Sequence, residues 1–135
     1  MKVVLDTNVV LRAVSRKSRF TVLFDELLDQ SYTLSISTEI LLEYEEKIQS
    51  FYGEETAQGF LNFLVMLPNV EKVEPFFQVR LIESDVDDNK FVDCAFASNA
   101  HYVVTDDKHF NILKTIDFPK IPVISAEEFH DLLVS

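Results

Sequence analysis

The chain has 135 residues, with 12 basic and 23 acidic side chains and a formal net charge of −11 at pH 7. At this length we expect one domain, residues 1–135, with enough chain for a buried core. The acidic balance disfavours a general nucleic-acid-binding surface, because such a surface needs positive charge. Acids gathered around divalent cations would reverse that conclusion.

The cysteine content and the apolar runs restrict the setting of the protein. Cys94 is the single cysteine, so an internal disulfide and a thiolate zinc cluster are excluded, and we expect a reducing, cytoplasmic environment. No run of about 18 apolar residues is present, and Asp6 soon interrupts the apolar residues after Lys2. We therefore expect no membrane span and no signal peptide.

The first half of the chain shows strand and helix patterns in alternation. In order, we expect a strand at 3–5, a helix at 20–28, a strand at 32–36, a helix from about 38 to 51 and a helix from about 53 to 67. Asp6 and Asn8 are expected in a loop after the first strand. Ser37 or Thr38 can cap the fourth element, and Pro68 ends the fifth.

The second half continues the alternation. The expected elements are a strand at 70–73, an acidic loop at 83–89, a helix at about 88–99, a strand at 101–105, a strand at 121–124 and a final helix. Ser125 and Glu128 form a Ser-x-x-Glu capping box at the start of that last helix. Strands alternating with helices predict an α/β fold with a mainly parallel sheet.

Acidic side chains follow two of the predicted strands and begin or line two of the predicted helices. Asp6 comes directly after the first strand, and Asp106 and Asp107 follow the strand at 101–105. Asp88 begins the helix that leads into that strand, and Glu43 lies in the helix after the second strand. Sites in parallel sheets lie beyond the carboxyl ends of the strands, so the fold could bring these acids together.

Each acid also has an ordinary interpretation. Asp88 and Asp107 could be helix caps, and Glu43 could be one more solvated acid. If the carboxylates do converge, their repulsion is unfavourable unless a cation compensates it. Mg²⁺ and Mn²⁺ prefer oxygen ligands, and ions held by acids can activate water and stabilise charge on a phosphate. The convergent interpretation predicts metal-dependent phosphodiester hydrolysis.

Four segments resemble a PIN-domain protein, of the VapC-like kind found as the toxin ribonuclease of toxin–antitoxin pairs. They are VVLDTNVVL, SISTEILLEYEE, DDNKFVDCAFASNAHYVVTDDKHF and PVISAEEF, in the family's order and over nearly the whole chain. The resemblance implies an α/β/α sandwich around a central, mainly parallel sheet of about five strands. It also implies a single-strand-specific RNase that uses Mg²⁺ or Mn²⁺ and leaves 5′-phosphate and 3′-hydroxyl ends, a small antitoxin partner and a homodimer.

The resemblance assigns roles by position. The implied catalytic acids are Asp6, Glu43, Asp88 and Asp107. Asp6, Asp88 and Asp107 would bind the metal, and Glu43 would bind it or orient the attacking water. The implied supporting residues are Asn8 and Thr105, and the additional candidates are Asp93 and Asp106. Asp106 and Asp107 compete for the last acidic position.

Basic residues and histidines have weaker assignments. Four basic residues soon after Asp6 could guide an RNA backbone or could be ordinary solvated side chains: Arg12, Arg16, Lys17 and Arg19. The three histidines are expected to be structural or exposed: His101, His109 and His130. Cys94 lies in an apolar helix pattern and is expected to be buried.

Two rival functions are compatible with the same fold. A non-catalytic PIN-like module that binds RNA or protein would keep the fold without the chemistry, although the full set of acids disfavours it. A magnesium-dependent phosphatase usually has a second aspartate two residues after the first, and Asn8 occupies that position here. Metal-dependent RNA cleavage is therefore the leading hypothesis.

Overall fold

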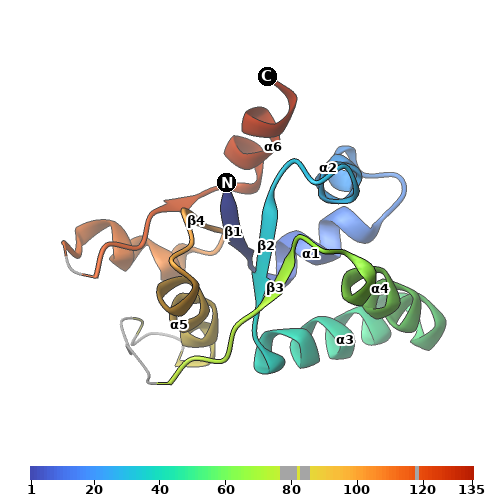
Figure 1. The fold of residues 1–135 in the computed structure, drawn as a ribbon, viewed down its shortest axis with the longest axis horizontal. Coiled ribbons are helices and arrows are strands. Elements are labelled where there is room, and N and C mark those ends of the chain that lie inside the picture. Colours follow the sequence, from blue (N-terminus) through green and yellow to red (C-terminus); the bar gives the residue numbers. More distant parts are fainter. Residues whose placement is uncertain (77–81, 83–85, 118) are drawn as a thin grey trace.

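Five parallel strands form the centre of the protein (Figure 1). The structure is a computed structural model that describes residues 1–76, 82, 86–117 and 119–135. The sheet order is β3-β2-β1-β4-β5, and every pairing is parallel. The strands are β1 (Lys2–Leu5), β2 (Thr33–Ile36), β3 (Val70–Lys72), β4 (Tyr102–Val104) and β5 (Val123–Ile124). The predicted α/β fold with about five parallel strands is confirmed.

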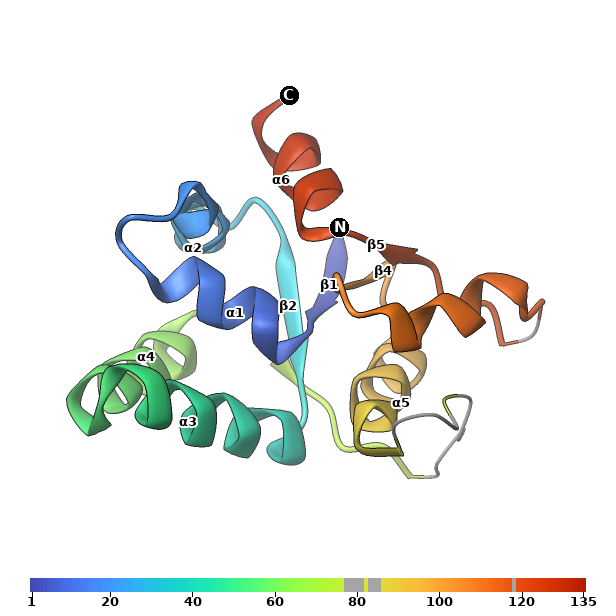
Figure 2. The ribbon, with the colours of Figure 1, turned by 180° about the vertical axis from the view of Figure 1, so that it is seen from behind.

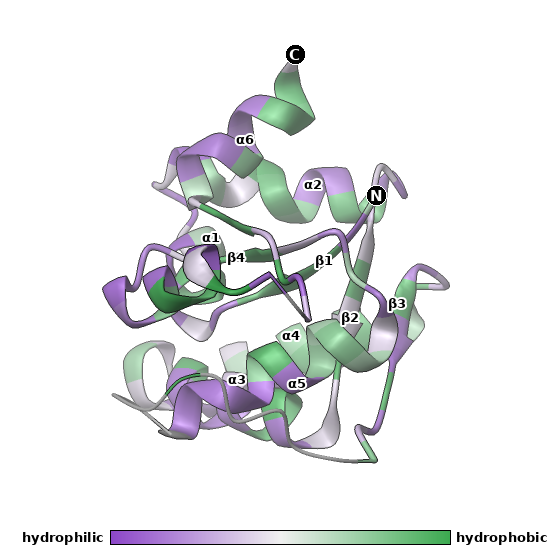
Figure 3. Cartoon of the chain, turned by 90° about the vertical axis from the view of Figure 1, so that its left-hand side faces the viewer, coloured by the Kyte–Doolittle hydropathy of each residue, from purple (hydrophilic) through white to green (hydrophobic). Residues whose placement is uncertain are grey.

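Helices lie on both sides of the strands, as an α/β/α sandwich requires. They are α1 (Thr7–Val14), α2 (Val22–Leu28), α3 (Thr38–Tyr52), α4 (Glu54–Met66), α5 (Asn89–Ser98) and α6 (Ala126–Val134). The described residues also form 3₁₀ helices: η1 (Arg19–Thr21), η2 (Val86–Asp88) and η3 (Lys108–Thr115). Figure 3 shows α2 and α6 above β1 and β4, with α3, α4 and α5 below. Among the described residues, no helix combines the length and apolar character needed to cross a bilayer.

The segment after Asp6 differs from the sequence-based expectation. We expected a loop there, but α1 begins at Thr7, directly after β1. The buried residues Val9, Val10 and Ala13 lie at helical spacing and form the face that packs into the core. The polar start of the helix hid this pattern in the sequence. Of the expected acidic loop, residues 83–85 lie outside the described residues, and 86–88 form η2.

The predicted helix starts are confirmed at two places. The Ser37 side chain accepts a hydrogen bond from the Ile40 backbone N–H and caps α3. Ser125 and Glu128 form the reciprocal capping box that begins α6. Cys94 is fully buried in α5, as expected, and burial raises the pKa of its thiol to about 12.

One buried hydrogen bond ties α3 to the end of the central strand. The strand β1 contributes Val3, Val4 and Leu5, all fully buried because the sheet is covered on both faces. The hydroxyl of Tyr44, also fully buried, donates to the Leu5 carbonyl oxygen. Glu43 immediately precedes Tyr44, so this bond also positions the backbone of Glu43 relative to the end of β1.

Replacing Tyr44 with Phe should lower the free energy of unfolding by about 1–3 kcal/mol, because the buried Leu5 carbonyl loses a partner. Urea unfolding followed by circular dichroism measures this difference. Tyr52 offers a matched control, since its exposed hydroxyl donates to the Leu11 carbonyl of α1 from the end of the same helix. Tyr52→Phe should cost less, and an equal loss in both variants would contradict the role given to Tyr44.

Candidate functional site

The carboxyl ends of β1 and β4 meet through one threonine. Leu5 and Val104 are paired in register, and the Asp6 N–H donates to the Val104 carbonyl at 3.0 Å. Thr105, which directly follows β4, donates its hydroxyl to Asp6 Oδ2 at 2.8 Å. The same hydroxyl accepts from the Asp107 N–H at 3.0 Å. Thr105 therefore holds two of the predicted acids side by side.

Asp6 is a buried acid in an unfavourable electrostatic position. Its exposed fraction is 5%, and its pKa is raised from the usual 3.8 to about 6. Burial is the largest cause, and the nearby charges of Asp107 and Glu43 add to it. The hydrogen bond from Thr105 acts in the opposite direction but does not offset these effects. A positive charge at this position would lower the cost.

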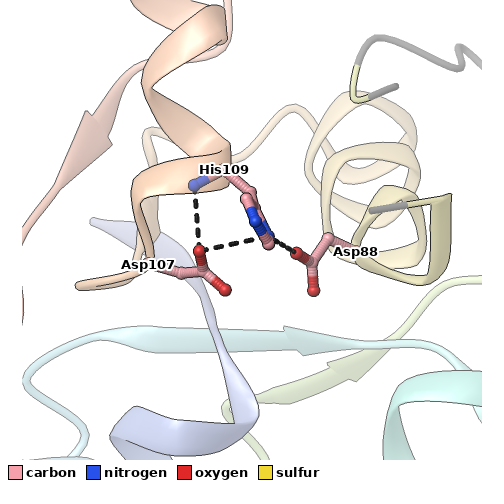
Figure 4. Close-up of side chains that lie close together, drawn as sticks. All are labelled: Asp88, Asp107 and His109. Carbon is pink, nitrogen blue, oxygen red and sulfur yellow. Dashed lines mark hydrogen bonds and ion pairs between the residues drawn. The ribbon is translucent and has the colours of Figure 1, made fainter. Parts of the chain in front are cut away.

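Asp88 and Asp107 lie on either side of the His109 ring (Figure 4). His109 Nδ1 is 3.4 Å from Asp88 Oδ2 and 3.3 Å from Asp107 Oδ1. Asp107 Oδ1 also accepts the His109 backbone N–H at 2.9 Å and so caps η3, as the alternative interpretation of Asp107 expected. One ligand atom from each of these three residues lies within 4.8 Å of the others.

Glu43 is held from two sides. One of its carboxylate oxygens accepts from the Thr7 hydroxyl, and the other is 2.8 Å from Lys90 Nζ. The Lys90 side chain is only 5% exposed and also lies 2.9 Å from the Asp87 carboxylate. Burial alone would lower the pKa of Lys90, but its bonds to Glu43 and Asp87 raise it above the usual 10.5. Lys90 is therefore a cation within the acidic cluster.

The helices α1, which carries Thr7, and α3, which carries Glu43, begin at the same end of the sheet. In Figure 2, β1 leads directly into α1 and β2 leads into α3 at the lower end of the strands. Asn89, at the start of α5, bonds the backbone of Ile82 through both its side-chain oxygen and its side-chain nitrogen. These contacts fix the start of α5, which directly follows Asp88, against the backbone of Ile82.

Asp106 points away from this cluster. Its Oδ1 accepts from the Ala126 N–H at the start of α6, at 3.1 Å, and its Oδ2 is paired with Arg12. Asp107, by contrast, faces Asp88 and His109. The geometry thus separates two neighbouring acids that the sequence left in competition.

Asp93 and Asn8 lie in α5 and α1, respectively. Asp93 is buried in α5 and lines a pocket of about 430 Å³ whose other walls include Ser37, Glu74 and Lys90. Asn8 is exposed in the first turn of α1. Its neighbour Thr7, rather than Asn8, contacts an acid of the site.

The four basic residues predicted near the site are only partly available. Arg12 is paired with Asp106 and Arg19 with Glu127, and both guanidinium groups lie over the Phe20 ring. Arg16 and Lys17 are exposed between α1 and η1. Another pocket, of about 180 Å³, opens beside Asp107 and is lined by Thr105, Asp106, Lys108, Asn111 and Lys114, among others.

The donor groups fit a hard divalent cation. Asp88 and Asp107 offer carboxylate oxygens close together, and Thr105 links Asp107 to Asp6. The raised pKa of Asp6 reports the electrostatic cost that a bound cation would remove. Asp6, Asp88 and Asp107 could therefore hold Mg²⁺ or Mn²⁺, ions that prefer oxygen ligands.

Three contacting residues were not assigned to the site from the sequence. Thr7 follows Asp6 directly, Lys90 lies two residues after Asp88, and His109 lies two residues after Asp107. We expected His109 to be structural or exposed, and it is in fact partly exposed beside two predicted acids. A polar or basic residue within two positions of each acid was the available signal.

The α/β/α fold, with acids gathered beyond the ends of its parallel strands, indicates the class of protein to which this chain belongs. A model of the PIN domain matches residues 2–109, which is most of the chain. The chain belongs to the PIN domain family. A search of curated proteins found no match.

Solved structures with the same fold include bacterial VapBC proteins. The structure of VapBC2 from Rickettsia felis bound to a promoter DNA fragment matches with a TM-score of 0.64 and 21% identity, over 93% of this chain and 98% of that chain. VapBC-1 from nontypeable Haemophilus influenzae matches with a TM-score of 0.64 and 16% identity, over 94% and 99%. The PIN domain endonuclease Utp24 matches with a TM-score of 0.52 and 19% identity, over 92% of this chain and 84% of that chain. At these identities the likeness establishes the fold.

The pKa of Asp6 predicts a pH-dependent stability in the absence of metal. An acid whose pKa is higher in the folded state binds more protons there, so stability falls as pH rises from about 4 to above 6. The change from 3.8 to about 6 corresponds to roughly 3 kcal/mol. Asp6→Asn should therefore be more stable than the parent chain at about pH 7.5 in EDTA, by up to that amount.

Urea unfolding of both proteins in EDTA at about pH 4.5 and 7.5 measures this effect. The stability difference between Asp6→Asn and the parent chain should grow with pH. Asp106→Asn serves as the control, because the Asp106 carboxylate is partly exposed and paired with Arg12. A difference for Asp6→Asn that stays constant between the two pH values would contradict the electrostatic account of Asp6.

Proposed function

We propose that the protein is a metal-dependent endoribonuclease that cleaves single-stranded RNA. The observation that carries the proposal is the convergence of Asp6, Asp88 and Asp107, with Glu43 nearby, at the carboxyl end of one parallel sheet. Membership of the PIN domain family and the likeness to the endonuclease Utp24 support a nuclease. We place the activity in the cytoplasm as part of the same proposal.

The roles follow from the contacts of each side chain. Asp6, Asp88 and Asp107 would hold the divalent ion, Mg²⁺ or Mn²⁺. When bound, such an ion activates water and stabilises negative charge on a phosphate. Glu43, fixed by Thr7 and Lys90, orients the attacking water. Thr105 holds the Asp6 carboxylate and the Asp107 backbone through one hydroxyl group.

The reaction is hydrolysis of the phosphodiester bond. Water adds to phosphorus and the bond from phosphorus to the 3′-oxygen breaks. The leaving 3′-oxygen takes a proton, so the products carry a 5′-phosphate and a 3′-hydroxyl. Lys90 contributes a fixed positive charge 2.8 Å from one Glu43 carboxylate oxygen.

RNA would approach along the edge that carries Asp107. The pocket beside Asp107 includes the exposed Lys108 and Lys114 in its lining. Arg16 and Lys17, exposed after α1, extend the positive charge on another side. These side chains would offset the repulsion that the net charge of −11 imposes on an RNA backbone.

A role as the toxin of a toxin–antitoxin pair is part of the proposal. This chain is similar to chains of the VapBC and FitAB structures over nearly the full length of those chains. The likeness to these toxin–antitoxin proteins supports a small antitoxin partner. A homodimer is proposed as well, because Phe51, Val65 and Met66 of the α3–α4 hairpin are exposed apolar side chains. Light scattering that finds only 15.6 kDa monomers would remove the homodimer from the proposal.

Cleavage of single-stranded RNA should require both a divalent ion and Asp107. In an assay with Mn²⁺ or Mg²⁺ on a labelled RNA, Asp107→Asn should reduce the cleavage rate by about 100-fold or more, because it removes a ligand charge from the site. The neighbouring change Asp106→Asn is the matched control. It should cost less than about tenfold, since Asp106 contacts Arg12 and α6 instead.

Product ends identified by mass spectrometry complete the test. RNA that is retained but not cleaved, with every ion supplied, would replace the proposed nuclease with a non-catalytic binding module. A larger loss for Asp106→Asn than for Asp107→Asn would reverse the assignment of the last acid.

A further inference from the structure

His109 lies beside Asp88 and Asp107, where a further ligand of the proposed metal site would lie. Its Nδ1 is 3.4 Å from Asp88 Oδ2 and 3.3 Å from Asp107 Oδ1 (Figure 4). Neighbouring ligands of a six-coordinate ion with bonds of about 2.1 Å are about 3.0 Å apart. The two distances from His109 Nδ1 are therefore close to the separation of neighbouring ligands on one ion.

The fold fixes His109 in this place from both sides. Its backbone N–H donates to the Asp107 carboxylate in the first turn of η3. The next residue, Phe110, is fully buried and packs against Phe91 of α5 at 6.3 Å between ring centroids. Phe91 belongs to the same helix whose start carries Asp88, so the two sides of the site are joined through the core.

An imidazole nitrogen changes which ions a carboxylate site prefers. Mg²⁺ is held through oxygen ligands and retains several waters, whereas first-row transition metals accept imidazole readily. A carboxylate site that also offers an imidazole is therefore biased away from Mg²⁺. With carboxylates alone, no such bias is expected.

We propose that His109 supplies a nitrogen ligand beside Asp88 and Asp107, and that this ligand makes the site select a divalent transition-metal ion such as Mn²⁺ over Mg²⁺. The inference rests on the proposed metal site of the nuclease, and it does not require that RNA be the substrate. It converts a histidine outside the acidic set into a determinant of metal choice.

Pulsed electron paramagnetic resonance on the purified protein with Mn²⁺ tests the ligand directly. A coordinated imidazole gives a ¹⁴N coupling to the bound ion, and this coupling should be present in the parent chain and absent in His109→Gln. Titration calorimetry should show Mn²⁺ affinity reduced by roughly 10–100-fold in the variant, with Mg²⁺ affinity changed less than about threefold. Circular dichroism confirms that the variant is folded.

His101→Gln is the matched control, because His101 lies before β4 and accepts a hydrogen bond from the Lys2 backbone N–H. It should keep the ¹⁴N coupling and the Mn²⁺ affinity. A parent chain that binds Mn²⁺ without ¹⁴N coupling, or that binds no Mn²⁺, would overturn the inference. RNA cleavage is measured separately, so a nuclease that fails to cleave RNA while showing the coupling would contradict only the proposed function.

Discussion

The burial of Asp6 among neighbouring carboxylates at one end of the sheet is the central physical constraint of this protein. The parallel register of β1 and β4 brings Asp6 next to Thr105, and Thr105 brings Asp107 next to Asp6. One part of the cluster carries its own compensation, since Lys90 pairs with Glu43, whereas Asp88 and Asp107 flank the His109 ring. Asp6 keeps an electrostatic cost, visible as a pKa of about 6. A divalent cation bound at this position, as proposed, would offset it.

The surrounding fold keeps this strained arrangement in place. Tyr44 ties α3 to the end of β1 through a buried bond, and Asn89 fixes the start of α5 through the backbone of Ile82. Buried polar groups with satisfied hydrogen bonds specify one geometry, because the alternative of leaving them unpaired is expensive. The apolar core stabilises the fold, and these few polar contacts position the segments that carry the acids.

Sequence patterns predicted the strands well, because buried parallel strands are short continuous apolar runs such as Val3–Leu5. They failed at α1, where the polar start beginning with Asp6 was interpreted as a loop. The positions of Asp6 and Asp107 could be anticipated from strand ends. The choice between Asp106 and Asp107 could not, because it depends on which carboxylate α6 and Arg12 engage. Lys90 and His109 act through partners distant in sequence, or through ring orientation, which no local pattern records.

Anomalous diffraction from crystals grown with Mn²⁺ tests most directly whether these carboxylates form one cation site. We expect a strong anomalous peak bordered by the side chains of Asp6, Asp88 and Asp107. An ion found only elsewhere on the protein, or no peak at saturating Mn²⁺, would contradict it.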